Sequence, residues 1–183
     1  MAALAASAAE AVTDTAMSIR AGDTEQATSA RLSYEAERRG LQAITNIVAT
    51  DERILRYRHA LPTGRGLGRH VMLVLNARRW GLVCTVTRFV HFGAPPAGLL
   101  EQHLAAARLA ARCIDMTRPG VPLSQVFAQL QLGYAGLGLP EDWRLHHQGG
   151  VAGYEPREWL VTPDTPDSID VGQAFVWNPS VGP

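Results

Sequence analysis

The sequence predicts an α+β fold in which a unit of two helices, a strand and a β-hairpin occurs twice. Two observations support this prediction. The stretch from Gly68 to Gly93 has the composition of two buried strands joined by a turn. In addition, two helix–glycine–helix patterns occur at one constant separation along the chain. This indicates an internal duplication, because a solenoid needs three or more copies.

Composition limits the class of protein. A chain of 183 residues that is 46% hydrophobic can fill the core of one domain. Its formal net charge is zero, so it gives no electrostatic reason to expect nucleic acid or an anionic membrane as partner. No apolar run approaches the ~18 residues of a membrane span. Cys84 and Cys113 lie in apolar surroundings, which is typical of buried, reduced thiols and predicts a cytoplasmic protein.

The first helix is predicted over residues 2–20, where alanine, the strongest helix former, dominates. This start differs from a signal peptide because it has no basic n-region and is interrupted by Glu10 and Asp14.

A second helix is predicted to begin after Thr24, a suitable N-cap, and to extend to Arg39. Gly40 stands where a glycine often ends a helix. A strand follows over residues 41–49.

The predicted hairpin comes next. Residues 70–75 are continuously apolar, and residues 81–92 are rich in β-branched and aromatic side chains. The segment 76–80, together with Gly81, is predicted to form the turn between the two strands.

The second half repeats the pattern, with a helix over 99–117, a break at 118–120 and a helix from about 123 to 134 that ends near Gly138. Coincidence between two ordinary helical pairs is the alternative to duplication. Three matches at one constant offset favour duplication: Arg20 with Arg118, Gly22 with Gly120, and Gly40 with Gly138.

The hairpin resembles the paired-strand signature of the M24 metallopeptidase family, which includes methionine aminopeptidase, aminopeptidase P, prolidase and creatinase. That signature reads roughly V-D-x-G-x-x-x-x-G-Y-x-x-D-x-T-R-T, and here Gly81, Thr87 and Arg88 match it. Segments 146–153 and 172–179 resemble the family motifs H-x-x-x-H-x-x-G and G-M-x-x-x-x-E-P-G. The resemblance covers nearly the whole chain. It implies the pita-bread fold, two pseudo-symmetric halves around a curved antiparallel sheet.

The resemblance also places the family's metal ligands on residues that do not suit metal. Family members use two aspartates, one histidine and two glutamates around two divalent cations, which require anionic oxygen. The aspartate positions are Val74 and Thr85, the histidine position is Gly150 and the first glutamate position is Asn178. The last glutamate would lie past Pro183. We therefore expect a divergent member with no metal site and no cofactor.

His59 is the first catalytic candidate. The segment 58–65 resembles the family's substrate-side histidine region, and in creatinase the histidine at this place is the acid–base catalyst. Histidine suits that role because its unperturbed pKa lies near neutrality. The alternative is a loop histidine without a function.

His146 is the second catalytic candidate, chosen by its family position, and His147 is a substrate-binding candidate. The sequence predicts that both lie on a strand, where adjacent side chains point to opposite faces. Glycines follow them, and these allow close approach of a ligand to the backbone. The alternative is a polar strand end before a tight turn.

Three further substrate-binding candidates are Tyr154, Arg157 and Asn178. Arg157 falls roughly where relatives have another histidine, and arginine can hold a carboxylate with two hydrogen bonds. An ion pair of Arg157 with Glu155 or Glu158 is an equally good interpretation.

Three functions stay open at this point. One is a metal-independent hydrolase or lyase that acts on a small amino-acid-like or peptide substrate, with His59 as acid/base and with His146 and Arg157 placing the substrate. Another is a non-catalytic pseudo-peptidase that binds a peptide or protein in the old cleft. The third is an ordinary metal-dependent aminopeptidase, which requires a different ligand register.

We expect one domain over residues 1–183, with a first half 1–93 and a second half 94–183 that is cut short at the C-terminus. The predicted strand 175–178 has no following hairpin partner, and this leaves an unpaired sheet edge. Because creatinase-like sites borrow residues from a partner subunit, the resemblance implies a homodimer.

Overall fold

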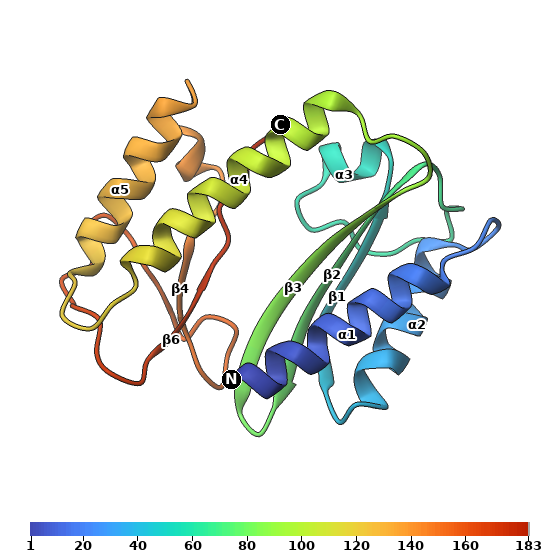
Figure 1. The fold of residues 1–183 in the computed structure, drawn as a ribbon, viewed down its shortest axis with the longest axis horizontal. Coiled ribbons are helices and arrows are strands. Elements are labelled where there is room, and N and C mark those ends of the chain that lie inside the picture. Colours follow the sequence, from blue (N-terminus) through green and yellow to red (C-terminus); the bar gives the residue numbers. More distant parts are fainter. Residues whose placement is uncertain (183) are drawn as a thin grey trace. The chain divides into compact units, whose positions relative to one another are not determined.

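The structure, a computed structural model, describes residues 1–182. The chain divides into two compact units, residues 1–95 and residues 96–182 (Figure 1). No helix within the described residues combines the length and the apolar character needed to cross a membrane.

The first unit is a three-stranded antiparallel sheet in the order β1-β2-β3, and α1 and α2 pack against one of its faces (Figure 1). Its elements are α1 (Ala2–Ser18), α2 (Glu25–Glu37), β1 (Gln42–Thr50), α3 (Glu52–Arg56), β2 (His70–Arg79) and β3 (Leu82–His91). The short helix α3 had no counterpart in the sequence prediction.

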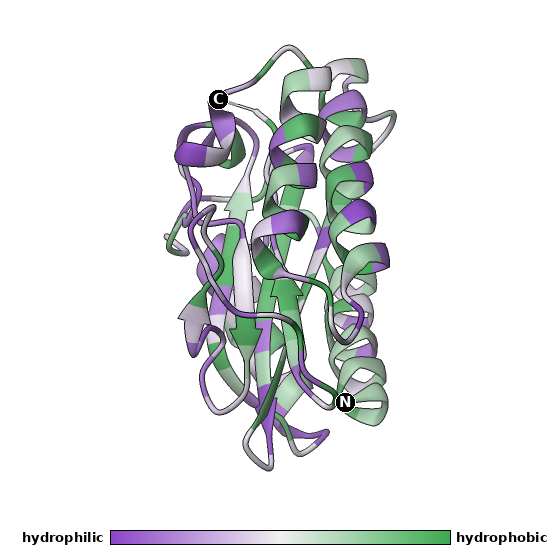
Figure 2. Cartoon of the chain, turned by 90° about the vertical axis from the view of Figure 1, so that its left-hand side faces the viewer, coloured by the Kyte–Doolittle hydropathy of each residue, from purple (hydrophilic) through white to green (hydrophobic). Residues whose placement is uncertain are grey.

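Alternation along β2 separates the two faces of this sheet. Val71, Leu73 and Leu75 are fully buried and belong to the core under the two helices. Met72 and Val74 belong to a smaller apolar cluster on the opposite face. In Figure 2 the strands are mostly hydrophobic, whereas hydrophobic and hydrophilic residues alternate along the helices.

The Thr24 cap and the glycine after the second helix are confirmed, although α1 ends at Ser18 and α2 at Glu37, two residues before the predicted ends. Thr24 caps α2, since its Oγ1 accepts a hydrogen bond from the Ala27 N–H at 3.1 Å. Gly40 has a φ of 70°, a left-handed conformation that favours glycine after a helix.

The prediction for the hairpin turn was wrong in extent. Residues 76–79 continue β2, and only Trp80 and Gly81 form the turn, with φ values of 52° and 76°. Two positive φ values are the mark of a type I′ turn, whose twist matches that of the flanking strands. The exposed Trp80 occupies a position that usually holds asparagine or glycine, so this two-residue turn lacks its usual sequence signal.

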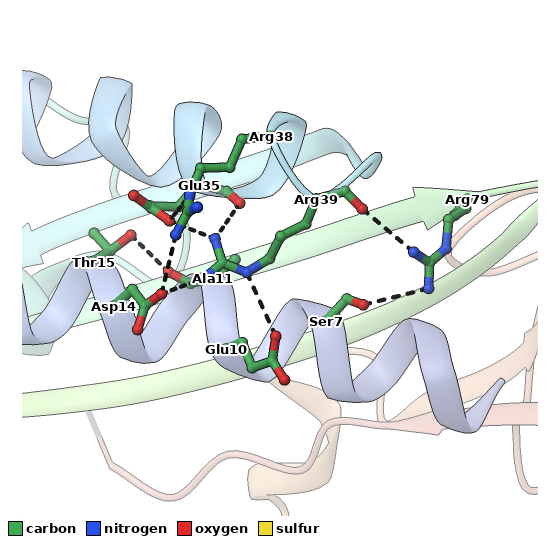
Figure 3. A network of polar contacts seen from close by, with 9 residues as sticks. All are labelled: Ser7, Glu10, Ala11, Asp14, Thr15, Glu35, Arg38, Arg39 and Arg79. Atoms are coloured by element: carbon green, nitrogen blue, oxygen red, sulfur yellow. Dashed lines mark hydrogen bonds and ion pairs between the residues drawn. The ribbon is translucent and has the colours of Figure 1, made fainter.

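An ion-pair network connects α1 to α2 (Figure 3). Arg39 bonds to Asp14 and Glu35, while Arg38 bonds to Glu35 at 2.5 Å. The hydrogen bond from Arg38 lowers the pKa of the Glu35 carboxyl. Arg79 of β2 donates to the Arg39 carbonyl oxygen at 3.4 Å and so extends the network to the sheet.

The second unit has two helices and a smaller three-stranded antiparallel sheet in the order β5-β4-β6. Strand β6 lies at an edge of this sheet. The elements are α4 (Ala97–Met116), α5 (Leu123–Gly136), the 3-10 helix η1 (Asp142–Arg144), β4 (Gly149–Ala152), β5 (Trp159–Leu160) and β6 (Ala174–Trp177).

Equivalent backbone contacts show that the helix pairs of the two units correspond, as the predicted duplication requires. The helix-ending hydrogen bond from Leu41 N to Ala36 O, 3.1 Å long, has a counterpart from Leu139 N to Tyr134 O at 3.0 Å. The matched glycines also share a conformation, since Gly138 has a φ of 75° against 70° for Gly40. The helix pairs of both halves therefore end in the same way.

Each unit contains one buried free cysteine, Cys84 in the first and Cys113 in the second. Burial raises the pKa of both thiols, and that of Cys113 to about 12. This confirms the prediction that both are buried free thiols.

Candidate substrate-binding site

Three of the predicted site residues form a hydrogen-bonded chain in the second unit. Arg157 Nη2 donates to Asn178 Oδ1 at 2.8 Å, and Asn178 Nδ2 lies 3.2 Å from His146 Nδ1. Arg157 precedes β5 and Asn178 follows β6, so the strand ends bring these residues together.

These hydrogen bonds determine which atoms of Asn178 and His146 donate and which accept. Because the Asn178 amide oxygen accepts from Arg157, its NH₂ group faces His146 Nδ1 as a donor. His146 Nδ1 is then the acceptor, and the proton of the neutral imidazole is on Nε2. Asn178 therefore orients the imidazole of His146.

Arg157 is half-buried among neutral partners. Its Nη1 donates to the Pro156 carbonyl oxygen at 2.5 Å, and its Nε is buried without a hydrogen-bond partner in residues 1–182. Burial lowers the pKa of the guanidinium, which nevertheless stays positively charged. A partly desolvated arginine with an unused donor suits a carboxylate ligand.

Gln148 and Tyr134 hold the loop that carries His146. Gln148 is 1% exposed, and its Nε2 donates to the carbonyl oxygens of Trp143 and His146 at 2.9 and 2.6 Å. The Tyr134 hydroxyl lies 2.9 Å from Gln148 Oε1 and accepts from Ser180 N at 3.1 Å. The sequence prediction missed this support, because Tyr134 reads as one more apolar position of α5.

The prediction for His146 and His147 was wrong in geometry. They lie in the loop between η1 and β4, outside any strand, and their ring centroids are 4.2 Å apart at an interplanar angle of 30°. The two rings therefore pack against each other. Both line a cavity of about 310 Å³, together with Phe127, Trp143 and Leu160.

Tyr154 is 73% exposed, and its backbone N–H donates to Glu158 Oε1 at 3.0 Å. Its role in substrate binding stays a prediction. The described hydrogen bonds of Arg157 go to Pro156 and Asn178. Its role as the cation of a carboxylate site stays a prediction.

His59 lies in the first unit, in the loop that follows α3, and is exposed. The buried carboxylate of Glu25 fastens this loop. Its Oε1 accepts from Thr50 N and Arg53 Nε, both at 3.0 Å, and its Oε2 accepts from Thr63 N at 2.9 Å and Thr63 Oγ1 at 2.7 Å. The catalytic role of His59 stays a prediction.

The residues at the family's metal-ligand positions do not fit a dinuclear centre. Val74 and Thr85 lie on one face of the first sheet, because Val74 pairs with Thr87 and Thr85 pairs with Asn76, two positions further along the ladder. Valine offers no donor, and threonine offers only a neutral oxygen. Within residues 1–182 no group of three or more His, Cys, Asp or Glu side chains comes together to hold a metal.

Gly150 of β4 excludes the family's histidine for a steric reason as well. A Cβ atom at this glycine would lie 2.0 Å from the Trp159 carbonyl oxygen and 3.0 Å from Leu160 Cα. These backbone atoms belong to β5, so any side chain at this position requires the strand to move.

The two halves, each with a helix pair over an antiparallel sheet, define an α+β protein of the pita-bread class. The chain belongs to metallopeptidase family M24, whose model matches residues 2–182. A search of curated proteins found no match.

Solved structures show the same fold. The prolidase from Pyrococcus furiosus superposes with a TM-score of 0.83 at 19% identity, over 98% of this chain and 56% of that one. A dipeptidase from Mycobacterium ulcerans gives 0.83 at 22% identity, over 95% and 48% of the two chains. The methionine aminopeptidase from Thermotoga maritima gives 0.74 at 18% identity, over 96% and 75%. The chain thus spans about half the length of the first two of these structures.

Proposed function

We propose that this chain is a metal-independent M24 domain that binds the carboxylate of a small amino-acid-like or peptide ligand through Arg157. The observation that carries the proposal is the series of hydrogen bonds from Arg157 through Asn178 to His146. At the position where the family has a metal-binding glutamate, Asn178 instead joins a cation to a histidine.

Charge supports this proposal. A metal centre at this place would need negative ligands, but the three hydrogen-bonded residues are a guanidinium, a neutral amide and an imidazole. These groups suit an anionic ligand. Solved relatives named Xaa-Pro dipeptidase and prolidase make a dipeptide a reasonable probe.

Metal-independent hydrolase or lyase chemistry is the second candidate. The fixed orientation of His146 favours it, since an imidazole with Nε2 protonated can donate a proton to a bound ligand. In this variant of the proposal His59 is the acid/base residue. A metal-dependent aminopeptidase is the least favoured alternative, because of the side chains at the ligand positions.

Binding of the dipeptide Ala-Pro to metal-free protein tests the proposal. We expect Arg157→Gln to weaken binding by a factor on the order of 10 to 100, because a hydrogen bond to a charged group contributes about 1.5–3 kcal/mol. The measurement is isothermal titration calorimetry in the presence of a chelator. Ala-Pro with an amidated C-terminus should bind the wild-type protein as weakly as Ala-Pro binds the variant.

Arg118→Gln is the matched control, since Arg118 lies in the same unit with its guanidinium paired to Asp115 and lies outside the lining of the cavity that contains His146 and His147. It should leave binding unchanged. Equal binding of acid and amide would contradict the role of Arg157. Product formation with chelator present, lost in His59→Ala or His146→Ala, would favour the catalytic candidate. Cleavage that appears only with added manganese, cobalt or zinc would overturn metal independence.

The homodimer and the cytoplasmic location stay predictions. Light scattering on the purified chain measures the first of these. In the second unit β6 is an edge strand, the kind of surface through which a second chain can add to a sheet.

A further inference from the structure

His70 and His91 form a close pair in the first unit, apart from every residue considered so far. They stand directly opposite each other in the antiparallel ladder, at the start of β2 and the end of β3. Their Nδ1 atoms are 2.8 Å apart, and their ring centroids are 5.0 Å apart at an interplanar angle of 61°. The Nδ1 atoms of the two rings therefore face each other.

The backbone around the pair is held from several sides. Asp51 Oδ1 accepts from His70 N at 3.1 Å, and the His70 carbonyl oxygen accepts from Asp51 N and Thr50 Oγ1, both at 2.9 Å. The Phe89 ring stacks on that of His91 with centroids 6.3 Å apart. Both imidazoles are half-buried, so their orientation is restricted while solvent still reaches them.

Neutral imidazole is a good ligand for zinc, copper and nickel ions, and each ring presents its Nδ1 to the other. With metal–nitrogen distances of ~2.0–2.1 Å, two ligands of a tetrahedral site stand ~3.3 Å apart. The observed 2.8 Å comes within a small side-chain rotation of that separation. The ion would take the place of the proton between the two Nδ1 atoms, and the ring that now donates would carry its proton on Nε2 instead.

We propose that His70 and His91 form a two-histidine site for a divalent first-row transition ion such as zinc, nickel or copper. Within residues 1–182 no third His, Cys, Asp or Glu side chain joins the pair, so the proposed site has two protein ligands from these residue types and water as its further ligands. This makes the site open and exchangeable. Val74 lies four residues along β2 from His70, about 13 Å away at 3.3 Å per residue, so the pair is distinct from the family's metal position.

The test is calorimetric titration of zinc and nickel ions into full-length, tag-free protein that has been stripped of metal. We expect one ion per chain, and long-range ¹H–¹⁵N spectra should show the Nδ1 signals of two histidines shifting. Uptake should disappear in His70→Ala and in His91→Ala. The ring-retaining variants His70→Phe and His91→Phe should give the same loss with unchanged circular dichroism, which separates loss of a ligand from loss of fold.

His103→Ala, in α4, is the matched control and should retain the ion. The double variant His146→Ala, His147→Ala should also retain the ion, which excludes this neighbouring histidine pair of the second unit as the binding site. The proposal is overturned if the wild-type protein takes up no ion, or if uptake survives removal of both His70 and His91. Loss of uptake in the double variant alone would overturn it too.

Discussion

Replacement of Glu25 by alanine is expected to lower the free energy of unfolding by about 3–5 kcal/mol. The carboxylate is fully buried and accepts four hydrogen bonds, two from Thr63, one from Thr50 N and one from the Arg53 guanidinium. Its removal leaves a partly buried cation and two backbone N–H groups without their acceptor. The loss also frees the loop between α3 and β2.

Urea unfolding followed by circular dichroism measures this effect. Glu52→Ala is the matched control, because Glu52 is an exposed carboxylate paired with Arg65 and its removal should change stability little. Glu25→Gln should fall between the two, since it keeps one of the two oxygen acceptors. If Glu25→Ala were as stable as the control, Glu25 would not be what fastens this loop.

Gly150→Ala is expected to lower the free energy of unfolding by about 3 kcal/mol. The new Cβ would lie 2.0 Å from the Trp159 carbonyl oxygen, and backbone cannot rotate away as a flexible side chain could. Strands β4 and β5 would have to separate, and with them the turn that carries Arg157.

Gly136→Ala is the control within the same unit, because this helical glycine has open space around its Cβ position. It should change stability slightly or increase it. Thermal unfolding of both variants checks the difference. Gly150→His should destabilise at least as much as Gly150→Ala and should not create a metal site. A stable Gly150→His variant that binds manganese would show that β5 can move to accommodate a side chain at this position, and would contradict the steric argument.

Much of the fold could be predicted from the sequence because its signals are local. The Thr24 cap and the glycine ends of the helices depend on neighbouring residues only, and they stand where we expected them. The duplication was visible because Gly40 and Gly138 must both adopt a positive φ. The short helix α3 and the two-residue β5 lack such signals, since each is too short to show a period.

The site was predicted less completely, for reasons of geometry. Residues Arg157, Asn178 and His146 were chosen one by one, but their mutual hydrogen bonds depend on how β4, β5 and β6 pair. Gln148, which is buried and donates to the His146 carbonyl oxygen, stands in no sequence pattern that would mark it. The wrong extent of the predicted hairpin turn also hid the histidine pair. His70 stands opposite His91 only when the turn consists of the two residues Trp80 and Gly81.

The two cysteines lie one in each unit, Cys84 on β3 and Cys113 on α4. An alkylating reagent attacks the thiolate, and burial with a raised pKa keeps both thiols protonated at neutral pH. Each sulfur therefore becomes reactive only when its own half opens. The two cysteines therefore report local opening separately, and the order in which they are alkylated tells which half of the duplicated fold opens first.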